Sequence, residues 1–131
     1  MSEFTPRLTS EGLPYGASAH QYYWNHANNP YATFDWCLAN CTCYAYGRAL
    51  EIGSPAPITL NTQWGVASAY HWNVCVGNGW RAIPWDASQV SPGDILQYGD
   101  YAAGLTSVNH VAFVEKVENG VITTSNSNYT G

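Results

Sequence analysis

The chain has 131 residues and a mass of 14.3 kDa, which gives room for one domain and excludes a two-domain protein. Only 10% of the residues are charged, against about 25% in typical soluble domains, whereas 46% are hydrophobic, so a folded chain is favoured over a disordered one. The formal net charge is −5 and the four cations are scattered. A basic face for a nucleic acid is therefore excluded.

The sequence shows no signal for export or for membrane insertion. No apolar run approaches the roughly 18 residues of a membrane helix, and residues 1–12 are polar, without the cationic start and apolar stretch of a secretory signal. We expect a soluble chain that is made in the cytoplasm.

Aromatic residues make up 15% of the chain, with little charge around them. Rings in such surroundings suit a groove for sugars or peptides, and they equally suit the core of a small domain. The composition leaves both interpretations open.

Three of the four cysteines lie within seven residues, at Cys37, Cys41 and Cys43, and the fourth is Cys75. Because no secretory signal indicates an oxidising compartment, we expect free thiols rather than a disulfide framework. The spacing lacks paired Cys-x-x-Cys units, and no histidine stands in a matching register, so zinc is not expected. We predict no metal and no cofactor.

Helical signals fill the first half of the chain, and strand signals fill the second, so the predicted fold class is α+β. A short helix is predicted within residues 16–29, ended by Asn28-Asn29-Pro30. A second helix is predicted over residues 40–52, because apolar residues recur there every three or four positions and Gly53 stands where a C-terminal cap belongs. A third is predicted over residues 61–72, with Asn61-Thr62 as its N-cap.

The second half begins with a short extended run over residues 79–84. The turn signal Ser91-Pro92-Gly93-Asp94 then leads into a strand over residues 95–98, and strand formers fill residues 110–117. Asn119-Gly120 is the pair favoured by a type I′ hairpin, so residues 121–129 are predicted to return as the next strand.

Cys41 would occupy the first turn of the helix at residues 40–52, where free backbone N–H groups and the helix dipole favour a thiolate. His110 opens a predicted strand, from which its ring could take the thiol proton. Asn126 and Asn128 follow on the neighbouring strand, and either amide could orient the imidazole. Each residue also has a structural explanation: a small core residue, a ring at a strand end and a turn former.

Four segments carry a resemblance to one known family, in the family's order along the chain. Asn40-Cys41-Thr42-Cys43-Tyr44-Ala45-Tyr46-Gly47-Arg48 resembles the nucleophile motif of the CHAP family (cysteine, histidine-dependent amidohydrolase/peptidase). The other three segments resemble the family's turn, histidine strand and closing motif, at residues 91–95, 109–114 and 124–129. The resemblance covers about two thirds of the chain and is loose over residues 1–39.

The resemblance implies a papain-like fold, with N-terminal helices packed on an antiparallel sheet, in a single catalytic domain over residues 1–131. Residues 1–39 would form its N-terminal segment and residues 40–131 its catalytic core. It implies cleavage of an amide bond in peptidoglycan through an acyl-enzyme thioester, with Cys41 as nucleophile and His110 as general base and then acid.

Two residues depart from the family pattern. Asn126 stands where many members have Glu, and this neutral amide would stabilise an imidazolium less than a carboxylate would. Whether Asn126 or Asn128 orients His110 stays open. Asn40 stands where Gln is usual, and the Cys41 backbone N–H is the oxyanion donor that we can name. Further side chains expected at the substrate are Trp64 and Trp72.

Three further residues bear on metals and disulfides. Some phage lysins of the family carry calcium in an acidic loop ahead of the nucleophile, but here that segment offers only Asp35, which is too few hard oxygens. Cys43 lies about 200° around a helix from Cys41, so we interpret it as a packing residue. Cys37 and Cys75 could pair in an oxidising medium.

The resemblance leaves the biological setting open. The domain could come from a phage endolysin, made without a signal peptide and released at lysis, or it could be excised from an extracellular lysin with its own wall-binding module. In either case we expect a monomeric domain whose partner is peptidoglycan, with a Gram-positive wall favoured. An amidase and an endopeptidase need the same triad, so the bond cleaved is also open.

Two other functions are compatible with the sequence. The first is a non-catalytic binder of cell wall or glycan that uses Trp64, Trp72, Trp80 and Trp85, although such a module has no use for a thiol at a helix start. The second is hydrolysis of a small amide metabolite, which would require a closed pocket instead of an open groove.

Overall fold

Helix α2 (Cys41–Glu51) is the helix that carries the expected nucleophile, and it confirms the prediction over residues 40–52 to within a residue at each end. Its end is set by Gly53, whose φ of +87° is costly for any residue with a Cβ. The N–H groups of Gly53 and Ser54 bond back to the carbonyls of Leu50 and Ala49, both at 3.0 Å. This is the closing pattern expected when glycine follows a helix.

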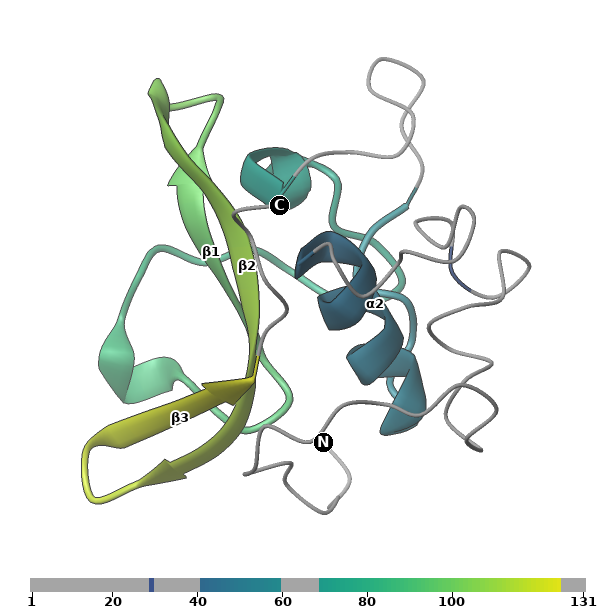
Figure 1. The fold of residues 1–131 in the computed structure, drawn as a ribbon, viewed down its shortest axis with the longest axis vertical. Coiled ribbons are helices and arrows are strands. Elements are labelled where there is room, and N and C mark those ends of the chain that lie inside the picture. The colour runs from purple at the N-terminus through teal and green to yellow at the C-terminus, as the bar shows by residue number, and fades with distance from the viewer. Residues whose placement is uncertain (1–28, 30–40, 60–68, 126–131) are drawn as a thin grey trace.

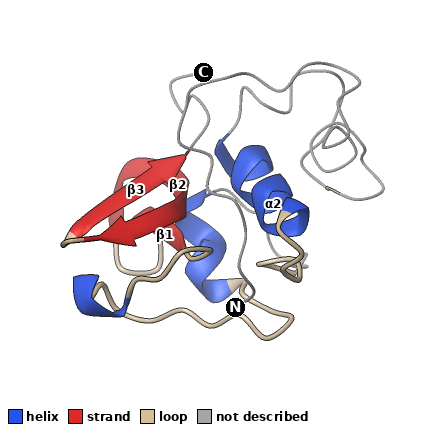
Figure 2. Cartoon of the chain, turned by 90° about the horizontal axis from the view of Figure 1, so that it is seen from below, coloured by secondary structure: helices blue, strands red, loops and turns tan. Residues whose placement is uncertain are grey.

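The computed structural model describes residue 29, residues 41–59 and residues 69–125 (Figure 1). Two short 3₁₀ helices, η2 (Ala69–Val74) and η3 (Ala87–Gln89), follow α2, and three antiparallel strands close the described chain. The strands are β1 (Ile95–Asp100), β2 (Leu105–Glu118) and β3 (Val121–Ser125), in the order β1-β2-β3. In Figures 1 and 2, α2 and η2 lie on the same face of this sheet. The α+β class is thus confirmed, whereas the papain-like arrangement stays a prediction.

The region of the third predicted helix differs from the prediction. Residues 60–68 lie outside the described part, and residues 69–74 form the 3₁₀ helix η2, which ends two residues later than predicted. The backbone of Tyr70 explains this local structure. Its N–H donates to Asn109 Oδ1 at 2.9 Å, and its carbonyl accepts from the Tyr101 N–H at 3.0 Å and from Gln97 Nε2 at 3.2 Å. These groups are bonded to the sheet instead of to a continuing α-helix.

The extended run predicted over residues 79–84 is not a strand in the structure. These residues are irregular and mostly exposed, so no apolar face holds them against the sheet. Pro84 lacks a backbone N–H for a strand ladder. The helix predicted within residues 16–29 lies outside the described residues except for Asn29, which is buried and donates to the Cys43 carbonyl at 3.0 Å.

Strand β2 begins at Leu105, five residues earlier than predicted, because a bulge in β1 lets the pairing continue. The register shifts between Tyr98 and Asp100, and Gly99 between them has φ of +87°. A Cβ at Gly99 would stand 1.8 Å from the carbonyl oxygen of Val108, so only glycine fits there without movement of the backbone.

The hairpin predicted at Asn119-Gly120 is confirmed. Both residues have positive φ, +53° and +77°, which a type I′ turn requires, and they join β2 to β3. β3 is described to Ser125, which pairs with Phe113. The rest of the predicted strand, residues 126–129, lies outside the described residues.

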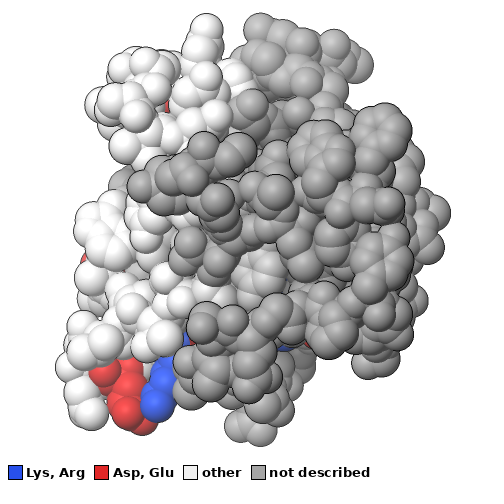
Figure 3. Space-filling model, viewed as in Figure 1, with Lys and Arg blue, Asp and Glu red and all other residues white. Residues whose placement is uncertain are grey.

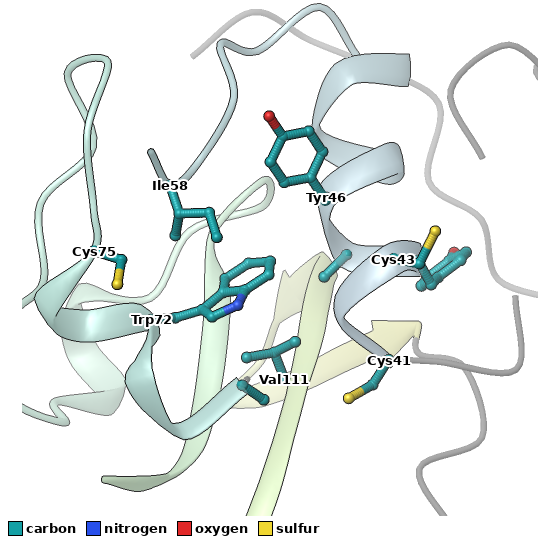
Figure 4. Packing of buried hydrophobic residues seen from close by; sticks show 10 residues of the cluster. Cys41, Cys43, Tyr46, Ile58, Trp72, Cys75 and Val111 are labelled. Atoms are coloured by element: carbon teal, nitrogen blue, oxygen red, sulfur yellow. The ribbon is translucent and has the colours of Figure 1, made fainter. Parts of the chain in front are cut away.

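The core forms between α2 and the sheet (Figure 4). Its buried cluster contains Cys41, Cys43, Tyr44, Ala45, Tyr46, Ile58, Ala69, Trp72, Cys75 and Val111. Alternate residues of β2 face this helix, because Val111 belongs to the cluster and the Phe113 ring lies 5.6 Å from the Arg48 guanidinium carbon. The face of β2 that packs against α2 is therefore apolar at Val111 and Phe113, and the next residue on this face is the charged Glu115.

Charged atoms are sparse over the described surface visible in Figure 3, apart from one small area at the lower left. This distribution accords with the low charge content of the chain. None of the described helices has the length and the apolar character needed to cross a bilayer.

Candidate functional site

Cys41 is the first residue of α2, and its side chain is directed toward β2 in Figure 4. It is only 5% exposed, and the Val111 backbone lies close enough to its sulfur to favour the thiolate. The nitrogen of Val111 is covalently bonded to the carbonyl carbon of His110. The thiol therefore lies against the peptide unit that joins His110 to Val111.

The pairing of the strands places this contact at an edge of β2. The Val114 N–H and carbonyl bond to Asp94 and Gly93, both at 2.8 Å, on the side of β1. Because bonding directions alternate along an antiparallel strand, the Val111 N–H points to the opposite side, where β3 runs. The last described residue of β3, Ser125, pairs with Phe113. The Val111 N–H near the sulfur thus lies two residues before Phe113, the residue of β2 that pairs with Ser125.

His110 lies on β2 directly across from Tyr98 of β1. The two rings stack, with centroids 5.6 Å apart and planes inclined by 17°, and His110 is 5% exposed. The preceding residue, Asn109, holds the Tyr70 N–H of η2. The strand that carries the expected base is therefore fixed by β1 on one side and by η2 near the same point.

Burial raises the pKa of the Cys41 thiol above its ordinary value of 9.0. Hydrogen bonds from the backbones of Val111, Thr42 and Cys41 itself favour the anion, but they act against the larger cost of desolvation. The expectation of a thiolate set by the helix start alone is therefore wrong. The raised pKa favours the thiol, so a nucleophilic role for Cys41 would require a base that removes its proton.

The cysteines also differ from the prediction of free thiols throughout. Cys41 and Cys75 are free and buried, whereas Cys43 is disulfide-bonded. The sequence left open a pairing of Cys37 with Cys75, which the free Cys75 excludes; Cys37 lies outside the described residues. In Figure 4 the sulfur of Cys43 is directed away from that of Cys41, as the helical angle between the two positions predicts.

The rate of alkylation should distinguish the two free thiols, Cys41 and Cys75, from the disulfide-bonded Cys43. Burial also raises the pKa of the Cys75 thiol, so iodoacetamide should react slowly at neutral pH with both Cys41 and Cys75. The rates should rise as the pH climbs past 9.0, because only the thiolate reacts. Cys43 should be labelled only after reduction. Peptide mass spectrometry across the pH range measures this, and fast, pH-independent labelling of Cys41 below neutrality would instead indicate a stable thiolate.

A buried polar network, which the sequence did not reveal, joins α2 to both β2 and β3. Glu115 is 0% exposed and accepts from Arg48 Nε and Nη2, both at 2.8 Å. The Ser125 hydroxyl donates to Glu115 at 2.5 Å and accepts from the Tyr44 hydroxyl at 2.8 Å. Arg48 also donates to Glu51 at 3.0 Å.

One signal in the sequence could have pointed to this network. Glu115 stands two and four residues after Phe113 and Val111, on the strand face that apolar residues fill. A carboxylate on a buried face needs a cation, and Arg48 is on the same helix face as Cys41, seven residues later.

Several expected site residues lie outside the described residues: Asn40, Trp64, Asn126 and Asn128. Trp72 is described and is 3% exposed within the core cluster. Its ring packs chiefly against protein, and the residue also lines a hollow beside β1. In the described ranges no group of three or more His, Cys, Asp or Glu side chains is arranged to hold a metal ion.

A hollow of about 1010 Å³ lies between the loop after α2, the irregular segment around residues 79–91 and β1. Trp80, Trp85 and Gln97 are among its lining residues, but Cys41 and His110 are not. The hollow therefore does not contain the candidate nucleophile or the candidate base. We take the region around Cys41 and His110 as the candidate active site.

Comparison with protein families gives one match. The model of the CHAP domain matches residues 27–128, which include every described residue of the site. No curated protein and no solved structure matches the chain. Members of this family are generally hydrolases of amide bonds in the bacterial cell wall, which accords with a buried thiol held beside a histidine strand. Since the match spans well over half of the sequence, the chain belongs to the CHAP domain family.

Proposed function

We propose that this domain is a cysteine-dependent peptidoglycan hydrolase in which Cys41 is the nucleophile and His110 the general base and acid. The observation that supports the proposal is the position of Cys41, at the first residue of α2 and near the Val111 backbone, because Val111 directly follows His110 on β2. Acyl transfer by a thiol requires a base that can take its proton, and His110, the residue before Val111 on β2, is the proposed base.

In the proposed reaction His110 takes the thiol proton as the sulfur attacks the carbonyl carbon of the amide. The Val111 N–H stabilises the sulfur anion before attack, and the Cys41 N–H at the start of α2 is the expected donor to the oxyanion. The C–N bond then breaks, and the imidazolium gives its proton to the leaving amine. The product at this stage is a thioester.

Water completes the cycle. His110 removes a proton from water, the hydroxide attacks the thioester carbonyl, and the thiol is restored as the carboxylic acid leaves. Asn126, the residue after Ser125, is the proposed orienting amide for the imidazole, with Asn128 as its alternative. An amide orients the ring without adding charge.

We propose a phage endolysin as the source, acting on the wall after release from the host cytoplasm, with an extracellular lysin as the other source. The disulfide at Cys43 supports action outside the cytoplasm, because disulfides persist in oxidising media. Both sources act on the same substrate, the peptidoglycan.

The products formed from purified walls test the reaction. Wild-type protein should release peptides with new amino termini if it is an endopeptidase, or free lactyl groups if it cleaves the junction between sugar and peptide. Mass spectrometry of the released material distinguishes the two. New reducing sugar ends without any amide cleavage would contradict the proposal, since a thiol and an imidazole do not provide the paired carboxylates of glycoside hydrolysis.

A second candidate function is non-catalytic binding to cell-wall glycan. It is favoured by the hollow lined by Trp80 and Trp85, because indole rings suit the apolar faces of sugars. Under this alternative the protein would sediment with walls and release nothing, and the Cys41→Ser variant would bind as well as wild type.

A further inference from the structure

We propose that Tyr44, Arg48, Glu115 and Ser125 form a positioning network that holds the nucleophile of α2 against the histidine strand. The network contains two hydrogen bonds from Arg48 to Glu115 at 2.8 Å, one from Ser125 to Glu115 at 2.5 Å and one from Tyr44 to Ser125 at 2.8 Å. This inference rests on the proposed function of Cys41 and His110 and assigns a role to residues outside that pair.

The spacing of the contacts shows how the helix is aligned. Cys41 contacts the Val111 backbone, and Arg48 binds Glu115 further along the same strand. From Cys41 to Arg48 an α-helix advances about 10.5 Å, and from Val111 to Glu115 a strand advances about 13 Å. The two distances are similar, so α2 runs along β2 in the same direction and is held at both ends of this stretch.

Tyr44 supplies a third anchor, on a different strand. It lies between Cys41 and Arg48 on the same helix face, and its hydroxyl bonds to Ser125 of β3. The contacts of Cys41 and Arg48 with β2 fix the direction of the helix axis. The contact of Tyr44 with β3 opposes rotation of the helix about that axis. Rotation matters because it would carry the Cys41 sulfur away from the Val111 N–H.

The ion pair between Arg48 and Glu115 is better suited to holding α2 in one position than to raising the stability of the fold. A guanidinium binds a carboxylate through two parallel bonds in one geometry, so the pair allows little sliding. A buried ion pair adds little net stability compared with apolar residues of similar volume, because both charges must be desolvated. A slip of about 1 Å at the reacting atoms can cost about a hundredfold in rate.

Removal of single hydroxyls tests the network while the ion pair stays intact. Tyr44→Phe and Ser125→Ala should each lower kcat about tenfold with KM unchanged within about twofold, because binding is retained and alignment is lost. Ser125→Thr keeps a hydroxyl and should restore most of the rate. Tyr101→Phe and Ser107→Ala make the same chemical changes at exposed positions and should leave kcat unaltered.

The ion pair is tested by an apolar replacement of both partners. Arg48→Met combined with Glu115→Leu should fold and yet lose about a hundredfold in kcat. If kcat in this variant and in Tyr44→Phe equals that of wild type wherever the protein is folded, the network is only structural and the proposal is wrong. If the double variant does not fold, the kcat values of Tyr44→Phe and Ser125→Ala alone test whether the network positions the nucleophile.

A measurement without substrate separates this proposal from the proposed function. The Val111 amide signal in a ¹H–¹⁵N spectrum reports its bond to the Cys41 sulfur. Its shift should move in Tyr44→Phe and Ser125→Ala toward the value in Cys41→Ala, and it should stay unmoved in Tyr101→Phe and Ser107→Ala. A moved signal in a protein that does not cleave walls would refute the hydrolase but retain the positioning role. An unmoved signal would refute the positioning role.

Discussion

Cys41→Ala should abolish the release of peptides from purified walls, and Cys41→Ser should lower it by at least about 10³-fold. Alanine removes the nucleophile. Serine keeps an oxygen in its place, but a hydroxyl is a far weaker acid than a thiol, so the imidazole of His110 cannot generate the anion efficiently. The loss should appear both in the clearing of turbid wall suspensions and in the mass spectrum of the released ends.

Cys75→Ala is the matched control for this prediction. Cys75 is the other free, buried thiol in the described part of the chain, and its backbone N–H donates to the Trp72 carbonyl while its carbonyl accepts from the Thr59 N–H, away from β2. This variant should clear walls at close to the wild-type rate. Equal clearing by wild type and Cys41→Ala would remove Cys41 from the reaction and would favour the binding function instead.

The parts of the fold that the sequence predicted best are those fixed by local chemistry. Gly53 ends α2 because its φ is positive, and Asn119-Gly120 forms the hairpin because both positions of a type I′ turn need positive φ. These constraints act within a few residues, so they are visible in the sequence. The apolar spacing of residues 40–52 is equally local, and it placed Cys41 in the first turn of α2.

The parts that the sequence did not predict depend on contacts between distant residues. The early start of β2 depends on the bulge at Gly99, and the 3₁₀ form of η2 depends on bonds from Tyr70 to Asn109 and to Tyr101. The pKa of Cys41 differs from the prediction for the same reason. The helix start was visible in the sequence, but the burial that outweighs it comes from tertiary packing.

Glu115→Leu alone should lower the free energy of unfolding by about 3–5 kcal/mol, a large share of the roughly 5–15 kcal/mol of a typical domain. The cost arises because the substitution leaves the Arg48 guanidinium buried without the Glu115 carboxylate. Arg48 is 4% exposed and would lose Glu115, whose carboxylate accepts two of its hydrogen bonds at 2.8 Å. Arg48→Met alone should cost a similar amount, since it leaves the carboxylate of Glu115 buried without its guanidinium.

Urea unfolding of the single and double variants measures this coupling. The double variant, Arg48→Met with Glu115→Leu, should lose less stability than either single variant, because it removes both desolvated charges together. Glu118→Leu is the matched control on the same strand. Its carboxylate lies 3.5 Å from Lys116 Nζ with both side chains well exposed, so its loss should cost less than about 1 kcal/mol.

The comparison of these two glutamates decides whether burial makes the network costly to break. If Glu115→Leu and Glu118→Leu destabilise the protein equally, then Arg48 finds solvent or another partner, and the network does not hold α2 in place. If the single Glu115 and Arg48 variants are each much less stable than the double variant, the charges depend on one another. The helix that presents Cys41 is then coupled to the strand of His110 through Glu115.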